Sequence, residues 1–421
     1  NGNTVGVAID SDNGKIYFAK NNTWGNSGNP LNGTNPAATF TASDDWQPIV
    51  YGPSGAVQTF NFGQKTLAYT PPSGYVALST ANLPDPAIPL PTAQFNTVFY
   101  TGNGGTNAIT GVGFQPDWVW AKARDATYSH GLFDAVRGVT KKLSSNLTGA
   151  EVTDSGLTAF GSDGFTMGSD AGMNGSSKTY VAWNWKANGS GSTNTVGSLD
   201  AVVSANAAAG FSIVTYTGNG SAQSIGHGLS KDLEFLVVKN RDANASWVVQ
   251  VSTTVNDYMY LNSTDGIQQS SIFGLDITRS NDGTFYYGGP DYMGANGVDY
   301  LAYCFHSIEG YSKIGVYTGN GNADGAFVNT GFKPAWIMIK NTSSGADTAS
   351  WVLFDTKRSP ANVVNKVFGV EDVASEYTVA NLIDINSNGF KMRDTHNSRN
   401  TNGNVYLYMA FAESPFKTAN A

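Results

Sequence analysis

The chain has 421 residues and a net charge of −8, with 13% charged residues, 12% aromatic residues and 49 glycines. The negative charge argues against a nucleic-acid partner, because binding to phosphate groups requires clustered Lys and Arg. No run of 18 apolar residues occurs, so the sequence predicts no insertion into a membrane. The single cysteine, Cys304, excludes an intramolecular disulfide framework. Abundant turn residues beside abundant aromatic residues indicate packed strands joined by turns, and therefore an all-β protein of several domains.

Residues 1–94 begin with two apolar segments, 5–10 and 15–20, on either side of an Asn-Gly pair. Asn-Gly supplies the positive φ angles of a tight turn, so this region predicts a β-hairpin. Residues 60–64 (Phe-Asn-Phe-Gly-Gln) are expected to form a further strand. The combination resembles the C-terminal half of a SPRY or concanavalin-like (lectin-like) sandwich. The resemblance implies that residues 1–94 are a partial sandwich whose other strands precede them.

Three related units follow in the chain. The pentapeptide Tyr-Thr-Gly-Asn-Gly occurs three times, starting at Tyr100, Tyr216 and Tyr317. Each copy is followed by an apolar strand that ends in lysine (Lys122, Lys239 and Lys340) and later by an aromatic strand. The same features in the same order at three places predict tandem β-sandwich repeats of jelly-roll-like type. The predicted limits are 95–190, 210–311 and 312–421, with the Gly/Ser/Ala-rich stretch 191–209 as a linker.

Longer motifs within the repeats are shared with a known family. They are the segment around Tyr-Thr-Gly-Asn-Gly at 203–220, Gly-His-Gly-Leu at 226–229, Glu-Gly-Tyr-Ser-Lys at 309–313 and Met-Ala-Phe-Ala-Glu-Ser-Pro-Phe-Lys at 409–417. These segments resemble phage tail-fibre proteins. The resemblance implies a location in the virion, outside the cell, a homotrimer, and contacts with other tail proteins on the N-terminal side. It transfers no active site.

Catalytic and cofactor-binding motifs are absent from the sequence, and the four histidines lack metal-ligand spacing, so we expect no cofactor and no metal. Asp134 and Asp355 recur at one repeat position, with Gln250 in the corresponding place of the second repeat. Each aspartate is followed three residues later by an arginine, Arg137 or Arg358. We interpret these as local ion pairs, not as the paired carboxylates of a glycoside hydrolase. The sequence therefore favours a protein that is not an enzyme.

A binding site is expected in the loop before the final aromatic strand of each repeat, because its position is constant while its chemistry changes. These loops are 169–175, 286–292 and 393–400. Tyrosine rings beside Asp and Asn suit sugars, which present apolar C–H patches edged by hydroxyl groups. The candidate glycan-binding residues are Tyr286, Tyr287, Asp291, Tyr292, Asp394, His396, Asn397 and Arg399. The alternative is that these loops are solvated turns without a ligand.

The sequence thus favours a structural or receptor-binding component of a phage tail fibre that contacts host-surface glycans. Two alternatives stay open. One is a secreted bacterial adhesin or surface filament built from the same sandwiches, and the other is a glycan depolymerase with a carboxylate-lined groove between subunits. The tryptophans on strands are expected in the core or at subunit contacts: Trp118, Trp120, Trp183, Trp185 and Trp336.

Overall fold

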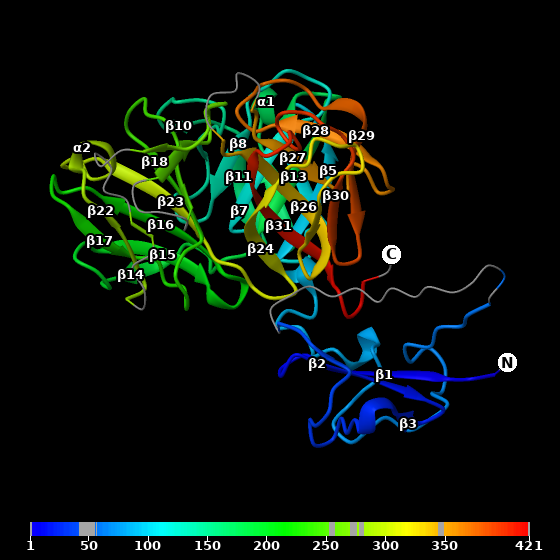
Figure 1. Cartoon of the computed structure of the whole chain (residues 1–421). Helices are drawn as coiled ribbons and strands as arrows, with labels where there is room; N and C mark the ends of the chain where they lie inside the picture. The colour runs from blue at the N-terminus through cyan, green and yellow to red at the C-terminus, as the bar shows by residue number, and fades with distance from the viewer. Residues whose placement is uncertain are drawn as a thin grey trace. The chain divides into compact units, whose positions relative to one another are not determined.

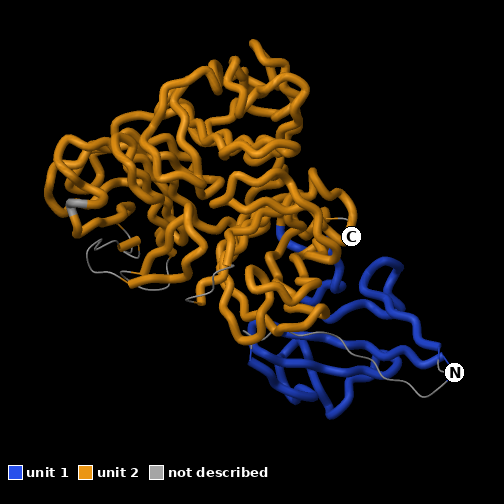
Figure 2. Tube along the Cα trace, turned by 90° about the horizontal axis from the view of Figure 1, so that it is seen from above, with its two compact units in different colours: residues 1–84 blue, residues 85–421 orange. Residues whose placement is uncertain are grey.

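The fold is described from a computed structural model of the chain (Figure 1). The structure describes residues 2–41, 55, 57–251, 257–269, 276–277, 282–343 and 349–419. Antiparallel β-strands dominate these residues, which confirms the predicted all-β class. Two compact units are present, residues 1–84 and residues 85–421 (Figure 2).

Unit 1 contains a small sheet built on a hairpin. Its elements are β1 (Val5–Asp10), β2 (Lys15–Lys20), β3 (Thr23–Trp24), β4 (Ala38–Thr39) and the 3-10 turns η1 (Gly25–Ser27) and η2 (Thr80–Asn82). β1 and β2 pair antiparallel around the predicted turn, in which Gly14 has a φ of 59°. The predicted strand at 60–64 is wrong. Asn61 Oδ1 accepts the backbone N–H of Gly63 at 3.1 Å, and such a local bond competes with strand pairing.

Unit 2 contains the three repeats. The first has η3 (Pro91–Ala93), β5 (Phe95–Thr101), β6 (Asn107–Thr110), β7 (Trp118–Ala123), β8 (Gly131–Asp134), β9 (Lys141–Lys142), β10 (Val152–Thr153), β11 (Leu157–Gly161), β12 (Gly164–Met167), α1 (Ala171–Asn174) and β13 (Thr179–Trp185). The second has β14 (Ser192–Asn194), β15 (Ala201–Asn206), η4 (Ala207–Ala209), β16 (Phe211–Thr217), β17 (Gln223–Gly226), β18 (Phe235–Asn240), β19 (Val248–Val251), β20 (Asp257–Tyr260), β21 (Gln268–Gln269), β22 (Thr284–Tyr287), α2 (Pro290–Met293) and β23 (Asp299–Phe305). The third has β24 (Ser312–Thr318), β25 (Phe327–Asn329), β26 (Phe332–Asn341), β27 (Val352–Asp355), β28 (Val364–Gly369), β29 (Tyr377–Asn386), β30 (Gly389–Met392) and β31 (Val405–Pro415).

The principal sheets of the three repeats share one strand order. It is β5-β13-β7-β8 in the first repeat, β16-β23-β18-β19 in the second and β24-β31-β26-β27 in the third. The register is also shared, because equivalent residues face one another across the strands. These cross-strand pairs are Trp118 with Trp185, Phe235 with Phe305, and Trp336 with Phe411. Equivalent positions of the three repeats can therefore be compared residue by residue.

The stretch 191–209 is not a linker. It contains β14 and β15, which extend the sheet of the second repeat beyond β16, with Val203 opposite Val214. The Gly and Ser content suggested flexibility, but the segment Ala-Val-Val-Ser within β15 can pair with the open edge of β16. The boundary between units also lies at 84/85 rather than 94/95, because Ile88 is buried in the core of unit 2.

The repeats share one apolar core, and the first and second repeats each have a further core cluster of their own. Aromatic residues at the starts and ends of the principal strands meet there. The ring centroids of Phe95 and Phe411 are 5.3 Å apart, those of Trp118 and Phe211 are 5.7 Å apart, and those of Phe305 and Phe411 are 6.1 Å apart. All five strand tryptophans are buried, and they pack against neighbouring repeats of the same chain.

A cyclic set of contacts closes the arrangement. The residue just before β8, β19 or β27 makes the same hydrogen bond in every repeat. Its side chain bonds to a backbone carbonyl of the neighbouring repeat, and the three carbonyls are also at equivalent positions. The pairs are Trp247 with Ser144 (2.8 Å), Trp351 with Tyr260 (3.0 Å) and His130 with Gly369 (3.0 Å). Because the first repeat bonds to the third, unit 2 is a closed ring of three repeats with approximate threefold symmetry.

Three buried lysines occupy the same ring interfaces, at the strand ends recognised in the sequence. Each ammonium group donates to a backbone carbonyl of the neighbouring repeat: Lys122 to Val373 (3.2 Å), Lys239 to Thr148 (3.1 Å) and Lys340 to Ser263 (3.3 Å). Burial lowers the pKa of each lysine to about 8. The lysines therefore belong to the framework of the ring.

The first glycine of the pentapeptide is required by close backbone packing. A Cβ at Gly102 would lie 2.2 Å from the carbonyl oxygen of Gly175, and Gly218 and Gly319 meet equivalent carbonyls at 2.4 and 2.3 Å. We expect Gly102→Ala to lower the free energy of unfolding by about 2–3 kcal/mol, because the backbone must shift. Urea denaturation measures this change. Gly149→Ala, where a Cβ meets nothing within 4 Å, is the control; an equal loss in both variants would contradict the explanation.

Candidate functional site

The three predicted recognition loops lie at the strand ends away from the shared core. β13 has seven residues and runs from the first loop to Trp185 in the core, a span of about 20 Å. β23 and β31 run the same way from their loops to Phe305 and Phe411. The ring thus holds these three loops at its periphery.

A pair of stacked tyrosines fixes each loop. The rings of Tyr100 and Tyr180 lie 4.8 Å apart, the Tyr100 hydroxyl donates to Met173 O at 2.7 Å, and the Tyr180 hydroxyl accepts the N–H of Gly175 at 2.8 Å. The second and third repeats carry the same stack with the same two kinds of bond, made by Tyr216 with Tyr300 and by Tyr317 with Tyr406. The tyrosine of the pentapeptide is therefore structural.

The second loop keeps only part of its predicted site at the surface. Tyr287 is fully buried beside Tyr216, and burial raises its pKa to about 12, so it is a core residue that no glycan can reach. The strand alternation on β22 explains this, because Tyr286 and Tyr287 face opposite sides. Tyr286 is half-buried, whereas Tyr292 on α2 is 50% exposed. The side chain of Asp291 lies outside the described residues.

The third loop is held together by its own polar groups. Arg399 is buried and donates to Asp394, with Nε 3.0 Å from Oδ2. The backbone carbonyl of Asn397 accepts the Tyr406 hydroxyl at 2.9 Å. His396 is exposed, and burial of part of its ring together with nearby Arg399 lowers its pKa. Arg399 is thus unavailable to a ligand, and Asp394 is engaged in holding the loop.

Two tyrosines that the sequence did not single out belong to the same region as Tyr292, since Tyr292 is close enough to Tyr260 to contribute to its raised pKa. Tyr258 and Tyr260, two residues apart on β20, are half-buried, and their ring centroids are 5.3 Å apart. Burial raises the pKa of Tyr260 to about 12, with smaller contributions from Tyr258 and Tyr292. We call Tyr258, Tyr260 and Tyr292 the tyrosine cluster. No local sequence signal could have found it, because β20 and α2 are brought together only by the fold.

Polar groups border the tyrosine cluster. The Tyr258 hydroxyl donates to Gln268 Oε1 at 2.9 Å. Asp265 is close enough to Tyr260 to contribute to its raised pKa, and its carboxylate accepts the Ser263 hydroxyl at 2.7 Å. The second repeat thus carries aromatic rings edged by an amide and a carboxylate.

The predicted Asp–Arg ion pairs are confirmed. Arg137 Nε lies 2.5 Å from Asp134 Oδ2, Arg358 Nε lies 2.5 Å from Asp355 Oδ2, and all four side chains are buried. Each aspartate also accepts a hydrogen bond from the next repeat around the ring. The donors are the Tyr303 hydroxyl to Asp134 (2.9 Å) and Trp183 Nε1 to Asp355 (3.0 Å). The pairs therefore stabilise the contacts between repeats as well as each repeat.

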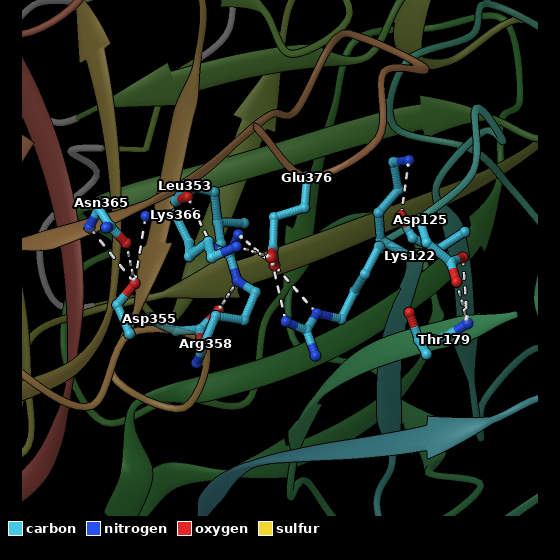
Figure 3. Close-up of polar contacts among 12 residues, drawn as sticks. Lys122, Asp125, Thr179, Leu353, Asp355, Arg358, Asn365, Lys366 and Glu376 are labelled. Carbon is cyan, nitrogen blue, oxygen red and sulfur yellow. Dashed lines mark hydrogen bonds and ion pairs between the residues drawn. The ribbon is translucent and has the colours of Figure 1, made fainter. Parts of the chain in front are cut away.

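A glutamate extends each ion pair to a second arginine. Glu376 lies 3.6 Å from Arg358 and 3.1 Å from Arg124 of the first repeat, and Figure 3 shows it facing Arg358 and Lys366. Glu151 bridges Arg137 to Arg241 of the second repeat in the same way, at 3.0 Å to each. We call these two groups the ion-pair clamps. Carboxylates held in this way are framework residues.

Among the residues that the structure describes, no such clamp is present at the third interface, between the second and third repeats. Val251, not Gln250, occupies the place of Asp134 and Asp355, because it faces Phe235 as those residues face Trp118 and Trp336. Met409 stands where the other interfaces have Tyr303 and Trp183. Apolar residues thus replace both members of the buried polar contact together.

The described residues contain no group of three or more His, Cys, Asp or Glu side chains that could hold a metal ion. Within the same residues, no helix is long and apolar enough to cross a membrane. Cys304 is buried, and burial raises the pKa of its thiol well above the usual value, so it is a small core residue.

Fold and site together define an all-β ring of three sandwich repeats with divergent peripheral loops. The sequence profile of a domain of unknown function, DUF7483, matches residues 90–415, which is the ring almost in full. The chain therefore belongs to the DUF7483 family. Comparison with curated proteins and with solved structures found no match.

Proposed function

We propose that the chain is a structural and receptor-binding component of a bacteriophage tail, located in the virion, which contacts host-surface glycans and is not an enzyme. The observation that supports this best is that unit 2 combines a constant framework with loops that differ between repeats. Equivalent positions in the shared core keep their roles in all three repeats, as do the lysine and Trp or His hydrogen bonds at the interfaces, while the loops at the strand ends differ. A rigid framework with variable loops suits recognition. The phage assignment itself rests on the resemblance of the repeat motifs.

The homotrimer and the tail-protein partners are part of this proposal. The aromatic faces of the repeats are already covered within one chain, so contacts between subunits would have to use other surfaces. Within unit 1, Val7 and Phe18 face each other across β1 and β2 and are both about half exposed, together with Val5 and Ile9 on the same face. An apolar sheet face of this kind is consistent with a protein partner on the N-terminal side.

The depolymerase alternative gains no support from the two carboxylates weighed for it. Asp134 and Asp355 are completely buried in the ion-pair clamps and lie at separate interfaces. The adhesin alternative shares the same framework and differs in the biological partner alone.

Binding to host cells tests the proposal. The purified full chain is incubated with whole cells and with extracted surface polysaccharide, and bound protein and released reducing sugar are measured in the same samples. We expect saturable binding without sugar release. Release of sugar would overturn the non-enzymatic assignment, and absence of binding to every candidate host tested would overturn the receptor-binding role.

A further inference from the structure

We propose that the tyrosine cluster of the second repeat is the sugar-contacting surface of this protein and that its ligand is a pyranose unit of a neutral glycan. This inference rests on the proposed function and adds to it the site and the class of ligand. It places binding on Tyr258, Tyr260 and Tyr292, at one of the three repeats, instead of on equivalent loops of all three.

The first argument is that the framework does not need these tyrosines. The other two repeats form the same strands and the same ring with unrelated residues at the equivalent positions. Those residues are Lys142 and Val367 for Tyr258, Ser144 and Gly369 for Tyr260, and Gly172 and Ser398 for Tyr292. Three tyrosines in a single repeat, at positions where the other two repeats fold with unrelated residues, indicate a role other than folding.

The second argument is that these positions are neighbours in space. In the first repeat, Lys142 donates to Asp170, which caps α1. The equivalent positions in the second repeat are Tyr258 on β20 and the first residue of α2, the helix that carries Tyr292. The short distance between the Tyr258 and Tyr260 rings and the electrostatic effect of Tyr292 on Tyr260 agree with this placement.

The third argument is chemical. Tyr292 exposes half of its surface, and Tyr258 and Tyr260 expose part of theirs, so ring faces and hydroxyl groups are presented together. Gln268 and Asp265 beside them can exchange hydrogen bonds with sugar hydroxyls, while the rings cover C–H faces. The carboxylate of Asp265 and the net charge of −8 disfavour an acidic sugar. The neutral hexopyranose is the ligand class that fits these groups.

The equivalent regions of the first and third repeats offer less aromatic surface to a sugar. In the first repeat the position of Tyr258 is occupied by Lys142, which forms ion pairs with both Asp154 and Asp170. In the third repeat Arg399 and Asp394 pair with each other. Charged groups that already satisfy one another provide no aromatic surface for a sugar ring.

Substitutions borrowed from the other repeats test the proposal without threatening the fold. The variants are Tyr258→Lys and Tyr260→Ser, taken from the first repeat, and Tyr292→Ser, taken from the third. With the glycan that wild-type protein binds, we expect each single variant to bind about tenfold more weakly and the triple variant to show no binding, because buried aromatic contacts dominate such interfaces. Tyr69→Ser, at a 41% exposed tyrosine of unit 1, is the control and should bind as wild type.

A second readout separates failure of the site from failure of the proposed function. Glucose, galactose and N-acetylglucosamine are titrated to millimolar concentrations against full-length protein with ¹³C-labelled tyrosine rings. Saturable shifts of the three cluster resonances support the site, even with no host identified. If wild-type protein binds cells and the triple variant binds equally well, the site is wrong and the function stands. If no hexose shifts these resonances, the inference is overturned.

Discussion

Asp355→Ala is expected to lower the free energy of unfolding of unit 2 by about 3–5 kcal/mol, the range found when one partner of a buried ion pair is removed. Arg358 would keep its charge in a buried site, and its Nε would lose the acceptor that lies 2.5 Å away. Trp183 Nε1 of the first repeat would lose its acceptor as well. The substitution therefore weakens the contact between repeats together with the third repeat itself. Urea denaturation followed by tryptophan fluorescence measures the loss.

The second repeat suggests the compensating variant. At the equivalent interface, Val251 of the second repeat and Met409 of the third take the places of Asp355 and Trp183. Asp355→Val combined with Arg358→Met should recover the part of the stability that Asp355→Ala loses through the unpaired arginine, because no uncompensated charge remains. Trp183 Nε1 still lacks its acceptor in this variant, so recovery is partial. Asp85→Ala, which removes the exposed ion pair with Lys417, is the control and should leave stability unchanged. A double variant as unstable as the single one would show that packing, not charge, limits this interface.

Acid is expected to destabilise unit 2 through His130. Trp120 Nε1 can only donate, and it lies 2.8 Å from His130 Nδ1, so the proton of the neutral ring is on Nε2 and points to Gly369 O. Burial, with Lys122 and Arg358 nearby, lowers the pKa of His130 to about 3. Protonation of Nδ1 would break the bond from Trp120. The closure between the first and third repeats therefore depends on a neutral histidine, whereas Trp247 and Trp351 hold the other two interfaces at any pH.

The direction of the pH effect follows from proton uptake. Between pH 6.5 and about 3 the unfolded chain binds a proton at His130 that the folded ring does not, so stability falls as the pH falls. The slope for one such group is about 1.4 kcal/mol per pH unit, and the total over this window is on the order of 5 kcal/mol. His130→Gln should remove this part of the slope, measured by urea denaturation from pH 7 to 4. His396→Gln, at an exposed histidine, should retain the part of the pH slope that comes from His130. Equal slopes in wild type and His130→Gln would contradict the role of His130.

The candidate site was only partly predictable. Tyr292 was identified from the composition of its loop and is half exposed, but Tyr287, from the same loop, is buried by strand alternation. Arg399 and Asp394 looked like ligand-binding groups and instead hold their loop together. Tyr258 and Tyr260 join Tyr292 through the pairing of β20 with β19, which no local pattern indicates.

By itself, the sequence determined the all-β class, the three repeats and the Asp–Arg pairs, because strands, turns and ion pairs three residues apart depend on local residue order. The closed ring was decided by the tertiary structure alone. Trp247, Trp351 and His130 reach carbonyl groups of other repeats, and His130 bonds to Gly369, which lies far along the chain. The strands within 191–209 were missed for the same reason, since β15 gains its hydrogen bonds from the free edge of β16 and not from its own composition. Contacts between distant segments depend on burial and on open strand edges, which appear only once the chain has folded.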